Sequence, residues 1–361
     1  LPSLLLPGVT LVISPLISLM KDQAEALRKR EIPAAYLESS LSTNEYGKIL
    51  HDTLNGRCKF LYVAPERLAN QQFCAFARRA NITMVAVDEA HCVSQWGRSF
   101  RKDYYNIPDF INQLPRKPLI AAFTATATSE VRLDILQRLQ IPDAKIVVTG
   151  FDRPNLYFGV KRTDDKNRST LEFLKKHKGQ CGIVYCATRA KVESVTQLLV
   201  KQGYIALRYH AGLTPEERRE NQNHFVSGRV PIIVATNAFG MGIDKPDVRF
   251  VLHYNMPKDL ESYYQEAGRA GRDGLESECL LRYDKSDMAV NTYLIGHDQP
   301  DLSVKDKELL LLEKMLNYCY TGSCLRRYLM EYFGEQAPRQ CNHCSSCDAN
   351  KNASWRKFLN L

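Results

Sequence analysis

An acidic pair follows a short apolar run in "MVAVDEAH", where Asp88 and Glu89 are followed two positions later by His91. Carboxylates at the end of a buried strand suit phosphoryl transfer, because one can hold Mg²⁺ while the other orients or deprotonates the attacking water. A strand-terminal Asp-Glu pair is also common as a solvated loop pair or a helix cap. This string alone leaves both interpretations open.

Cationic groups for the same chemistry occur much later, in "YYQEAGRAGRDG". Gln265, Arg269 and Arg272 recur at three- and four-residue steps, which predicts neighbouring faces of one helix, and Gly268 permits close approach. Guanidinium groups stabilise the charge that spreads over the oxygens of a transferring γ-phosphate. A solvated basic helix is the alternative.

Two loops after apolar runs add candidate nucleotide contacts. In "ATNAFGMGIDKPDVR", Gly242 suits backbone contact with phosphate and Asp244 is placed to couple to it. In "FTATAT", Thr124 and Thr126 follow another predicted strand.

Aromatic and basic residues alternate directly after the acidic pair, in "WGRSFRK". Trp96 and Phe100 offer stacking faces to bases, and Arg98 and Arg101 offer phosphate contacts, as in single-strand binding. Burial of both aromatics in a core is the alternative. Further candidate strand contacts are Ser14, the loop around Arg67, His210 and Thr236, although each alone is more typical of a strand-end cap.

Four cysteines near the end of the sequence have metal-ligand spacing. Cys341, Cys344 and Cys347 are separated by two residues each, and Cys324 precedes them at a predicted helix start. Four thiolates form one tetrahedral zinc site, whereas an iron–sulfur cluster fits this spacing less well. Cys319 and His343 are spare candidates, with Cys319 expected in the core of the preceding helix.

These residues are carried by alternating strands and helices. One series ends near residue 150 and a second runs from about 151 to 300, which predicts two α/β lobes with parallel sheets whose ligands sit at the strand carboxyl ends. A helical, cysteine-bearing module is expected over 301–350. Residues 351–361 then begin a further region.

Composition sets the class of protein. The chain is 44% hydrophobic and 25% charged, as in globular proteins, and its net charge of +9 favours a polyanionic partner. Six cysteines scattered singly indicate a reducing, cytoplasmic environment. The uncharged start "LPSLLLPGVTLVISPLISLM" is interrupted by prolines and predicts a buried strand, so no membrane contact is expected.

In their order along the chain, "VISPLISLMKDQ", "LYVAPERL", "VDEAHCVSQWG", "FTATAT", "FDRPN", "YCATRAKVE", "YHAGL", "SYYQEAGRAGRDG" and the cysteine cluster resemble the RecQ family of superfamily 2 helicases. The resemblance implies two RecA-like lobes that bind ATP between them. It implies 3′-to-5′ movement on single-stranded DNA and work on branched DNA in recombination and repair, in the nucleoid of a bacterium or the nucleus of a eukaryote. It assigns Asp88 and Glu89 to Mg²⁺ and water, Arg269 and Arg272 to the ATP phosphates, residues 94–104 to sensing DNA, and the cysteines to structural zinc.

The sequence departs from that family in two places. "WGRSFRK" replaces the usual "WGHDFRP", which puts the coupling of DNA contact to hydrolysis in doubt. A phosphate-binding P-loop needs glycines followed by Lys and Ser or Thr, yet the single Gly-Lys pair, Gly47-Lys48, is followed by Ile49. We therefore expect a natural protein with its P-loop upstream of Leu1 and with protein partners bound through a C-terminal continuation. A P-loop-less nucleic-acid-binding protein and a DEAH-type RNA helicase are the alternatives.

Overall fold

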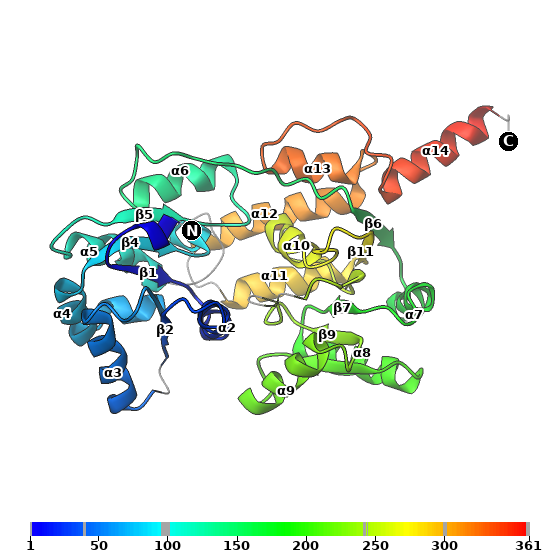
Figure 1. Cartoon of the computed structure of the whole chain (residues 1–361). Helices are drawn as coiled ribbons and strands as arrows, with labels where there is room; N and C mark the ends of the chain where they lie inside the picture. The colour runs from blue at the N-terminus through cyan, green and yellow to red at the C-terminus, as the bar shows by residue number, and fades with distance from the viewer. Residues whose placement is uncertain are drawn as a thin grey trace. The chain divides into compact units, whose positions relative to one another are not determined.

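The chain folds into two compact units, Leu1–Val148 and Thr149–Leu361. The computed structural model describes residues 2–38, 41–94, 102–240, 243, 245–298 and 302–358. Figure 1 shows the elements of each unit, which are described separately below.

Unit 1 is built on a five-stranded sheet in which every pairing is parallel. In order across the sheet, the strands are β2 (Ala34–Leu37), β3 (Phe60–Val63), β1 (Val9–Ile13), β4 (Ile82–Val87) and β5 (Leu119–Ala122). The uncharged N-terminal run thus contributes the central strand β1, as expected. None of the described helices combines the length and apolar character needed to cross a membrane.

Alternation along β1 explains why both faces of this sheet are covered. Leu11 and Ile13 join one core cluster, while Val12 packs against a second, because successive strand side chains point to opposite faces. The covering helices are α2 (Ile17–Arg28), α3 (Thr43–Leu54), α4 (Gln71–Arg79), α5 (Ile107–Asn112) and α6 (Ser129–Arg138). Polar caps start several of them: Ser42 and Glu45 form a capping box at α3.

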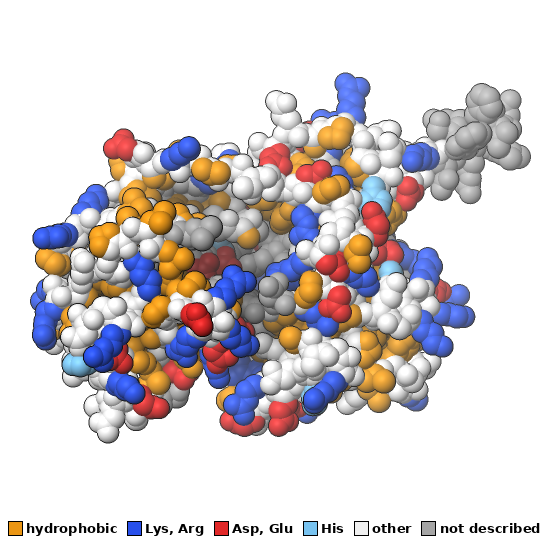
Figure 2. All heavy atoms as spheres, in the orientation of Figure 1, with side chains coloured by type: hydrophobic (Ala, Val, Ile, Leu, Met, Phe, Trp, Pro, Cys, Tyr) orange, Lys and Arg blue, Asp and Glu red, His pale blue; other side chains and the backbone are white. Residues whose placement is uncertain are grey.

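The β5 edge of unit 1 is apolar and exposed. Among the described strands, β5 borders β4 alone, and Leu119 and Phe123 at its two ends are each 57% exposed. Figure 2 shows hydrophobic side chains gathered on unit 1, in the region where Figure 1 draws the N-terminal helix α1 (Pro2–Leu5) over β4 and β5. An edge of this kind is a surface that a further strand can cover.

Unit 2 carries a six-stranded parallel sheet and most of the helices. Its strands, in order across the sheet, are β6 (Leu156–Arg162), β11 (Ser277–Tyr283), β10 (Phe250–His253), β7 (Gly182–Tyr185), β9 (Ile232–Ala235) and β8 (Ala206–Tyr209). Its helices are α7 (Lys166–Lys176), α8 (Arg189–Lys201), α9 (Pro215–Val226), α10 (Leu260–Ala267), α11 (Ser286–Asp298), α12 (Leu302–Tyr320), α13 (Leu325–Tyr332) and α14 (Ser345–Phe358).

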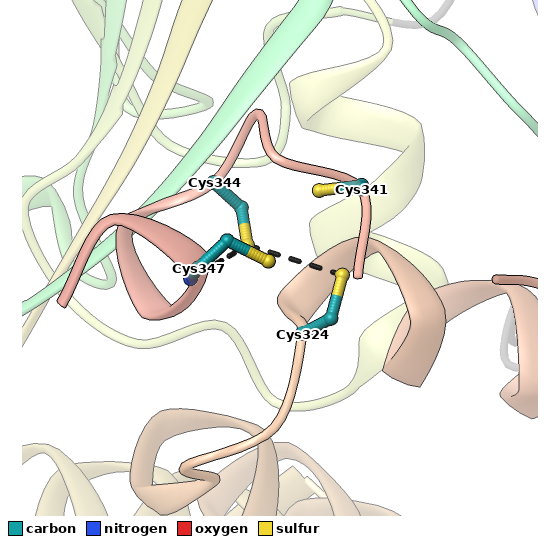
Figure 3. A group of neighbouring side chains, drawn as sticks. All are labelled: Cys324, Cys341, Cys344 and Cys347. Carbon is teal, nitrogen blue, oxygen red and sulfur yellow. Dashed lines mark hydrogen bonds between the residues drawn. The ribbon is translucent and has the colours of Figure 1, made fainter. Parts of the chain in front are cut away.

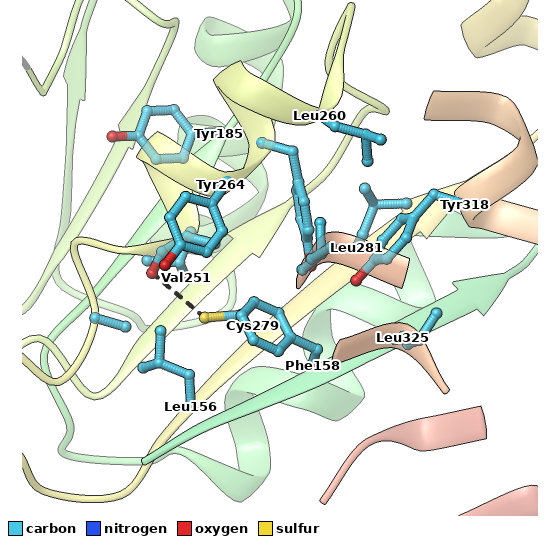
Figure 4. Packing of buried hydrophobic residues seen from close by; sticks show 14 of the residues in the cluster. Leu156, Phe158, Tyr185, Val251, Leu260, Tyr264, Cys279, Leu281, Tyr318 and Leu325 are labelled. Atoms are coloured by element: carbon cyan, nitrogen blue, oxygen red, sulfur yellow. Dashed lines mark hydrogen bonds between the residues drawn. The ribbon is translucent and has the colours of Figure 1, made fainter. Parts of the chain in front are cut away.

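The cysteine-bearing helices share the core of this second sheet. Phe158 and Leu281 from the strands lie in one buried cluster with Tyr318 of α12, Leu325 of α13 and Cys344. Figure 4 shows several of these side chains packed together. A backbone bridge also joins Phe158 to Cys344. The two parallel-sheet lobes and the helical module are therefore confirmed, while the boundaries at 300/301 and 350/351 stay predictions.

Candidate active site and metal centre

The acidic pair lies at the carboxyl end of β4, held by its neighbour β1. The Asp88 amide donates to the Ile13 carbonyl (2.9 Å), and the Ser14 hydroxyl donates to Asp88 Oδ2 (2.9 Å). Asp88 Oδ1 accepts the Glu89 amide (3.0 Å), and Glu89 has a left-handed backbone with φ of 47°. Few non-glycine residues adopt this left-handed conformation, and those that do cluster at functional sites. The turn thus fixes the Asp88 carboxylate and directs the chain sharply away.

His91 lies beside Glu89 and links it to two other predicted residues. His91 Nδ1 lies 3.3 Å from Glu89 Oε2 and 2.9 Å from the Thr124 hydroxyl, which in turn accepts the Thr126 amide (3.3 Å). The Ala90 amide donates to the Phe123 carbonyl (2.8 Å) and so joins the ends of β4 and β5. A chain of polar contacts therefore runs from the acidic turn to the threonine loop.

Ser14, one of the predicted DNA contacts, lies beside the acidic turn. It is fully buried, and its hydroxyl is bonded to Asp88. A buried polar group must find a partner within the protein, and here that partner is the acidic turn. Ser14 is therefore placed to orient Asp88, while its predicted contact with DNA stays a prediction.

Two tyrosines lie near Asp88: Tyr62, which sequence reasoning missed, and Tyr104, which was expected only as the last residue of the DNA-sensing segment 94–104. The Tyr104 hydroxyl donates to the Asp88 carbonyl (2.9 Å), and Tyr104 is fully buried. Burial, assisted by the Asp88 charge, raises the pKa of Tyr62 to about 12. Nothing local in the sequence marks either residue, since both reach Asp88 only through the fold.

The arginine pair of unit 2 lies on a turn and not on a helix, which corrects the predicted helical faces. α10 ends at Ala267, so it includes Gln265, and Gly268 caps it by donating its amide to the Tyr264 carbonyl (2.8 Å). Gly271, at φ of 56°, turns the chain in a conformation that disfavours a continued helix. We call residues 268–275 the arginine turn.

Both arginines of this turn donate to a neighbouring loop. The buried Arg269 guanidinium donates to the Gly240 carbonyl, and Arg272 Nη1 donates to the Ile243 carbonyl (2.9 Å). A Cβ on Gly240 would lie 2.4 Å from the Arg269 guanidinium, so a larger residue would displace this group, and the backbone φ of 150° also favours glycine. The guanidinium groups are held by backbone carbonyls.

The arginine turn has a support that the sequence reading did not identify, the "FDRPN" segment. Arg153 donates to the carbonyls of Gly268 (3.2 Å), Ala270 (3.0 Å) and Gly271 (2.9 Å). Asn155 Nδ2 donates to the carbonyls of Gly271 (2.8 Å) and Leu275 (2.9 Å). The Arg and Asn of "RPN" were a usable signal, because both can serve several backbone acceptors at once.

His210 and Thr236 occupy strand ends in unit 2. His210 is buried, with Nε2 2.8 Å from Glu193 Oε1 and Nδ1 accepting the Gly212 amide (3.2 Å). Burial raises the pKa of Glu193, but the bonds from Arg208 and His210 lower it overall, below its ordinary value. Thr236 is buried, and its hydroxyl accepts the Ala238 amide (3.4 Å). Both residues make the local contacts expected of strand-end caps.

The loop around Arg67 borders a pocket of about 340 Å³ in unit 1. Ile17, Glu38 and Asn70 are among its other lining residues. Arg67 Nη2 donates to the Glu38 carbonyl (2.9 Å), and its guanidinium lies over the Tyr46 ring at 5.4 Å.

Six predicted site residues lie outside the described residues: Trp96, Arg98, Phe100, Arg101, Gly242 and Asp244. Their assignments stay predictions.

The four predicted cysteines come together in unit 2. The sulfur atoms of Cys324, Cys341, Cys344 and Cys347 all lie within 4.8 Å of one another, and Figure 3 shows their side chains converging. Zinc with bonds of about 2.3 Å needs sulfurs about 3.8 Å apart, so small adjustments would suffice. Cys319 is buried in α12 as expected, and the side chain of the other spare candidate, His343, packs edge-on against Tyr157 (5.4 Å).

Backbone amides support the thiolate form that a metal requires. Amides donate to sulfur at Cys324 (from Arg327, 3.5 Å), at Cys341 (from His343, 3.3 Å) and at Cys344 (from Cys347, 3.5 Å). Burial raises the pKa of Cys324, but bonds from the Arg327 and Cys341 amides and from the neighbouring thiols lower it overall, below its ordinary value. At Cys341, Cys344 and Cys347 burial outweighs such bonds and raises the thiol pKa, so a metal ion is needed to hold these three as thiolates. The donor set and its spacing fit zinc.

Comparisons with known proteins agree with this geometry. The DEAD/DEAH box helicase family model matches residues 4–133, the helicase conserved C-terminal domain matches 165–274, and the RecQ zinc-binding model matches 285–348. The ATP-dependent DNA helicase RecQ of Bacillus subtilis is 45% identical over 347 residues, covering 96% of this chain and 58% of that protein. The chain belongs to the RecQ helicase family. The ATP-dependent helicase SGS1 of Saccharomyces cerevisiae is 37% identical over 96% of this chain and 24% of its own length.

Solved structures show the same fold at low identity. Yeast Dbp5 bound to RNA and ADP BeF3 gives a TM-score of 0.62 at 17% identity, covering 86% of this chain and 81% of that one. The helicase MrfA bound to DNA gives a TM-score of 0.64 at 16% identity, covering 97% of this chain and 49% of that one. Both units of this RecQ-family chain are thus RecA-like, and the chain spans little more than half the length of the bacterial RecQ proteins it matches.

Proposed function

We propose that this chain is the motor part of an ATP-dependent DNA helicase that moves 3′ to 5′ along single-stranded DNA and acts on branched DNA in recombination and repair. The observation that carries the proposal is its similarity to three bacterial proteins named ATP-dependent DNA helicase RecQ, at 38–45% identity over 96% of the chain. The polarity and the DNA structure are taken from the family and not from the geometry.

For hydrolysis, we assign roles along the acidic turn. Asp88 would hold Mg²⁺, and Glu89 would orient and deprotonate the attacking water. Each Asp88 oxygen accepts one described hydrogen bond, and a carboxylate oxygen can take more than one partner, so the group fits a cation. Mg²⁺, when bound, would neutralise the charge of the ATP phosphates. His91, Thr124 and Thr126 keep Glu89 in place.

We further propose that Arg269 and Arg272 contact the ATP phosphates. Gln265 lies on α10 and Gly268 caps that helix, directly before the two arginines. Gly242 and Asp244 complete the contacts of the loop that also holds the two guanidiniums. The two guanidiniums would exchange their carbonyl partners for phosphate oxygens, which are stronger acceptors.

A P-loop is still needed for this chemistry, and Gly47-Lys48 cannot supply it. Both residues lie inside α3, where no loop is free to wrap a phosphate. We propose that the natural protein carries its P-loop on a strand upstream of Leu1. The exposed apolar edge of β5 is suited to pair with such a strand.

For DNA, we propose that Trp96 and Phe100 stack on bases while Arg98 and Arg101 contact phosphates, with His210, Thr236 and the Arg67 pocket as further contacts. Zinc in the four-cysteine site would stabilise the helical module and take no part in the chemistry.

The test is nucleic-acid-stimulated ATP hydrolysis by the natural, P-loop-containing protein. Single-stranded DNA should stimulate turnover, and Glu89→Gln should abolish it while ATP still binds. Stimulation by RNA alone would refute the DNA assignment and favour an RNA helicase. One relative carries such a name: the "Putative ATP-dependent RNA helicase R290" of Acanthamoeba polyphaga mimivirus, which is 37% identical.

A further inference from the structure

Arg326 joins α13 to the first residues of unit 2. It is 5% exposed and lies two residues after Cys324, the N-cap of α13. Its guanidinium donates to Asp152 Oδ1 (2.6 Å) and to the carbonyls of Arg153 (2.7 Å) and Leu156 (2.6 Å). Bonds from a charged donor are stronger than neutral ones, so α13 fixes the backbone of 152–156.

A second set of contacts ties the same segment to the end of α13. The Phe151 amide donates to the Glu335 carboxylate (2.9 Å), and the Phe151 ring stacks on Phe333 at 4.5 Å and 10°. From the other side, the Tyr264 hydroxyl of α10 donates to the Phe151 carbonyl. Residues 151–156 therefore lie between α13 and the element that leads into the arginine turn.

Arg153 completes the connection because its own side chain bonds the turn. The carbonyls of Gly268, Ala270 and Gly271 follow the last helical residue of α10, where carbonyls lack partners within the helix. One guanidinium serves all three, with a planar array of donors that a lysine cannot reproduce.

We propose that Arg153 is a positioning residue for the arginine turn, and that Arg326 transmits the position of α13 to that turn through Arg153. When Arg326 releases 152–156, Arg153 no longer holds the three carbonyls, and Arg269 and Arg272 lose their fixed placement. The relay is a property of unit 2 itself. Its consequence for hydrolysis rests on the proposed function, in which these two arginines contact ATP.

The relay is tested by hydrogen exchange, followed by mass spectrometry, on the zinc-loaded 361-residue chain. Arg153→Lys and Arg326→Lys should each make the amides of 268–275 exchange at least about tenfold faster, the size expected from losing a charge-assisted hydrogen bond. Arg327→Lys is the matched control, because Arg327 is the next residue of α13 and bonds Glu331 of the same helix (2.6 Å). The control should leave these amides unchanged, and zinc content should stay the same in all three variants.

Unchanged exchange at 268–275 in both Arg153→Lys and Arg326→Lys would overturn the relay, as would uniform acceleration across unit 2. If Arg326→Lys does not fold, Asp152→Asn replaces it, since Asp152 is half-exposed and bonds Arg326 directly. A smaller acceleration confined to 268–275 is then expected, and no acceleration would refute the relay.

Turnover separates this relay from the proposed function. In the natural, ATP-hydrolysing protein, Arg153→Lys should lower kcat at least about tenfold with little change in KM for ATP, because transition-state contacts are lost. If exchange responds as expected but Arg269→Ala leaves kcat unchanged, the relay stands and the assignment of the arginines to ATP fails.

Discussion

At the scale of single residues, unit 2 contains a buried lysine, Lys166, that has no role in the proposed ATP hydrolysis. Lys166 is 5% exposed, and its ammonium lies 2.6 Å from Asp287 and 2.9 Å from Asp284. Asp287 also accepts a bond from Asn255 (2.8 Å). A buried charge with this many partners holds α7 to the start of α11, and removing one partner leaves the others uncompensated.

Lys166→Met should lower the free energy of unfolding by about 3–5 kcal/mol, because two carboxylates are left without their cation in a buried site. Chemical denaturation checks this. Lys161→Met is the matched control, since Lys161 pairs with Glu172 where both side chains are about half exposed, and it should cost no more than about 0.5 kcal/mol. Equal effects of the two substitutions would contradict this account.

Gly182 illustrates a constraint of packing. A Cβ there would lie 2.2 Å from the ring of Phe250, which is fully buried on the neighbouring strand. Gly182→Ala should therefore cost about 1–3 kcal/mol of stability through overpacking. Gly47→Ala, in a helix with no atom near the new methyl group, should instead stabilise by up to about 1 kcal/mol, and thermal unfolding distinguishes the two.

At the scale of elements, a histidine ties the end of α7 to β11. His177 Nε2 lies 3.0 Å from Glu278 Oε2, and the ring packs on Phe173 and Phe250. Burial lowers the pKa of His177, but the bonds from Glu278 and Gln180 raise it overall. A raised pKa in the folded state means that this contact stabilises fully below the ordinary pKa of histidine and that its contribution is lost as pH rises through the folded-state pKa.

Glu278→Gln should thus cost more stability at pH 5.5 than at pH 8. The difference should be at most about 1 kcal/mol, because the His177–Glu278 pair is partly exposed to solvent. Urea unfolding at the two pH values measures it. Asp52→Asn, beside the exposed His51, is the control and should show a difference below about 0.5 kcal/mol. A larger loss of stability at pH 8 than at pH 5.5 would contradict a raised pKa of His177 in the folded state.

At the scale of the whole molecule, the two units have separate cores, and the four-cysteine module belongs to the second. Chelating the metal should therefore lower the melting temperature of one calorimetric transition, that of unit 2, and leave that of unit 1 unchanged. Cys344→Ser should have the same effect. Equal shifts in both transitions would contradict independent cores.

The absence of a P-loop from the sequence gives a further prediction for the 361-residue chain. It should hydrolyse ATP no faster than its Glu89→Ala variant, because nothing in the sequence cradles the phosphates. A coupled phosphate-release assay checks this, with the natural P-loop-containing protein as positive control. Turnover clearly above that of Glu89→Ala would refute the assignment of a missing P-loop.

The sequence by itself determined the family, the two parallel lobes and the four cysteines. These depend on local patterns: β-branched runs alternating with helices, and thiols at fixed spacing. The tertiary structure decided which residues far apart in the sequence contact one another, because local patterns carry no information about such contacts. Ser14 bonds Asp88, the arginine pair lies on a turn because α10 ends at Ala267, and Arg153 and Arg326 bond the segments around that turn. The physical reason is that a hydrogen-bond partner more than seventy residues away leaves no trace in periodicity or spacing.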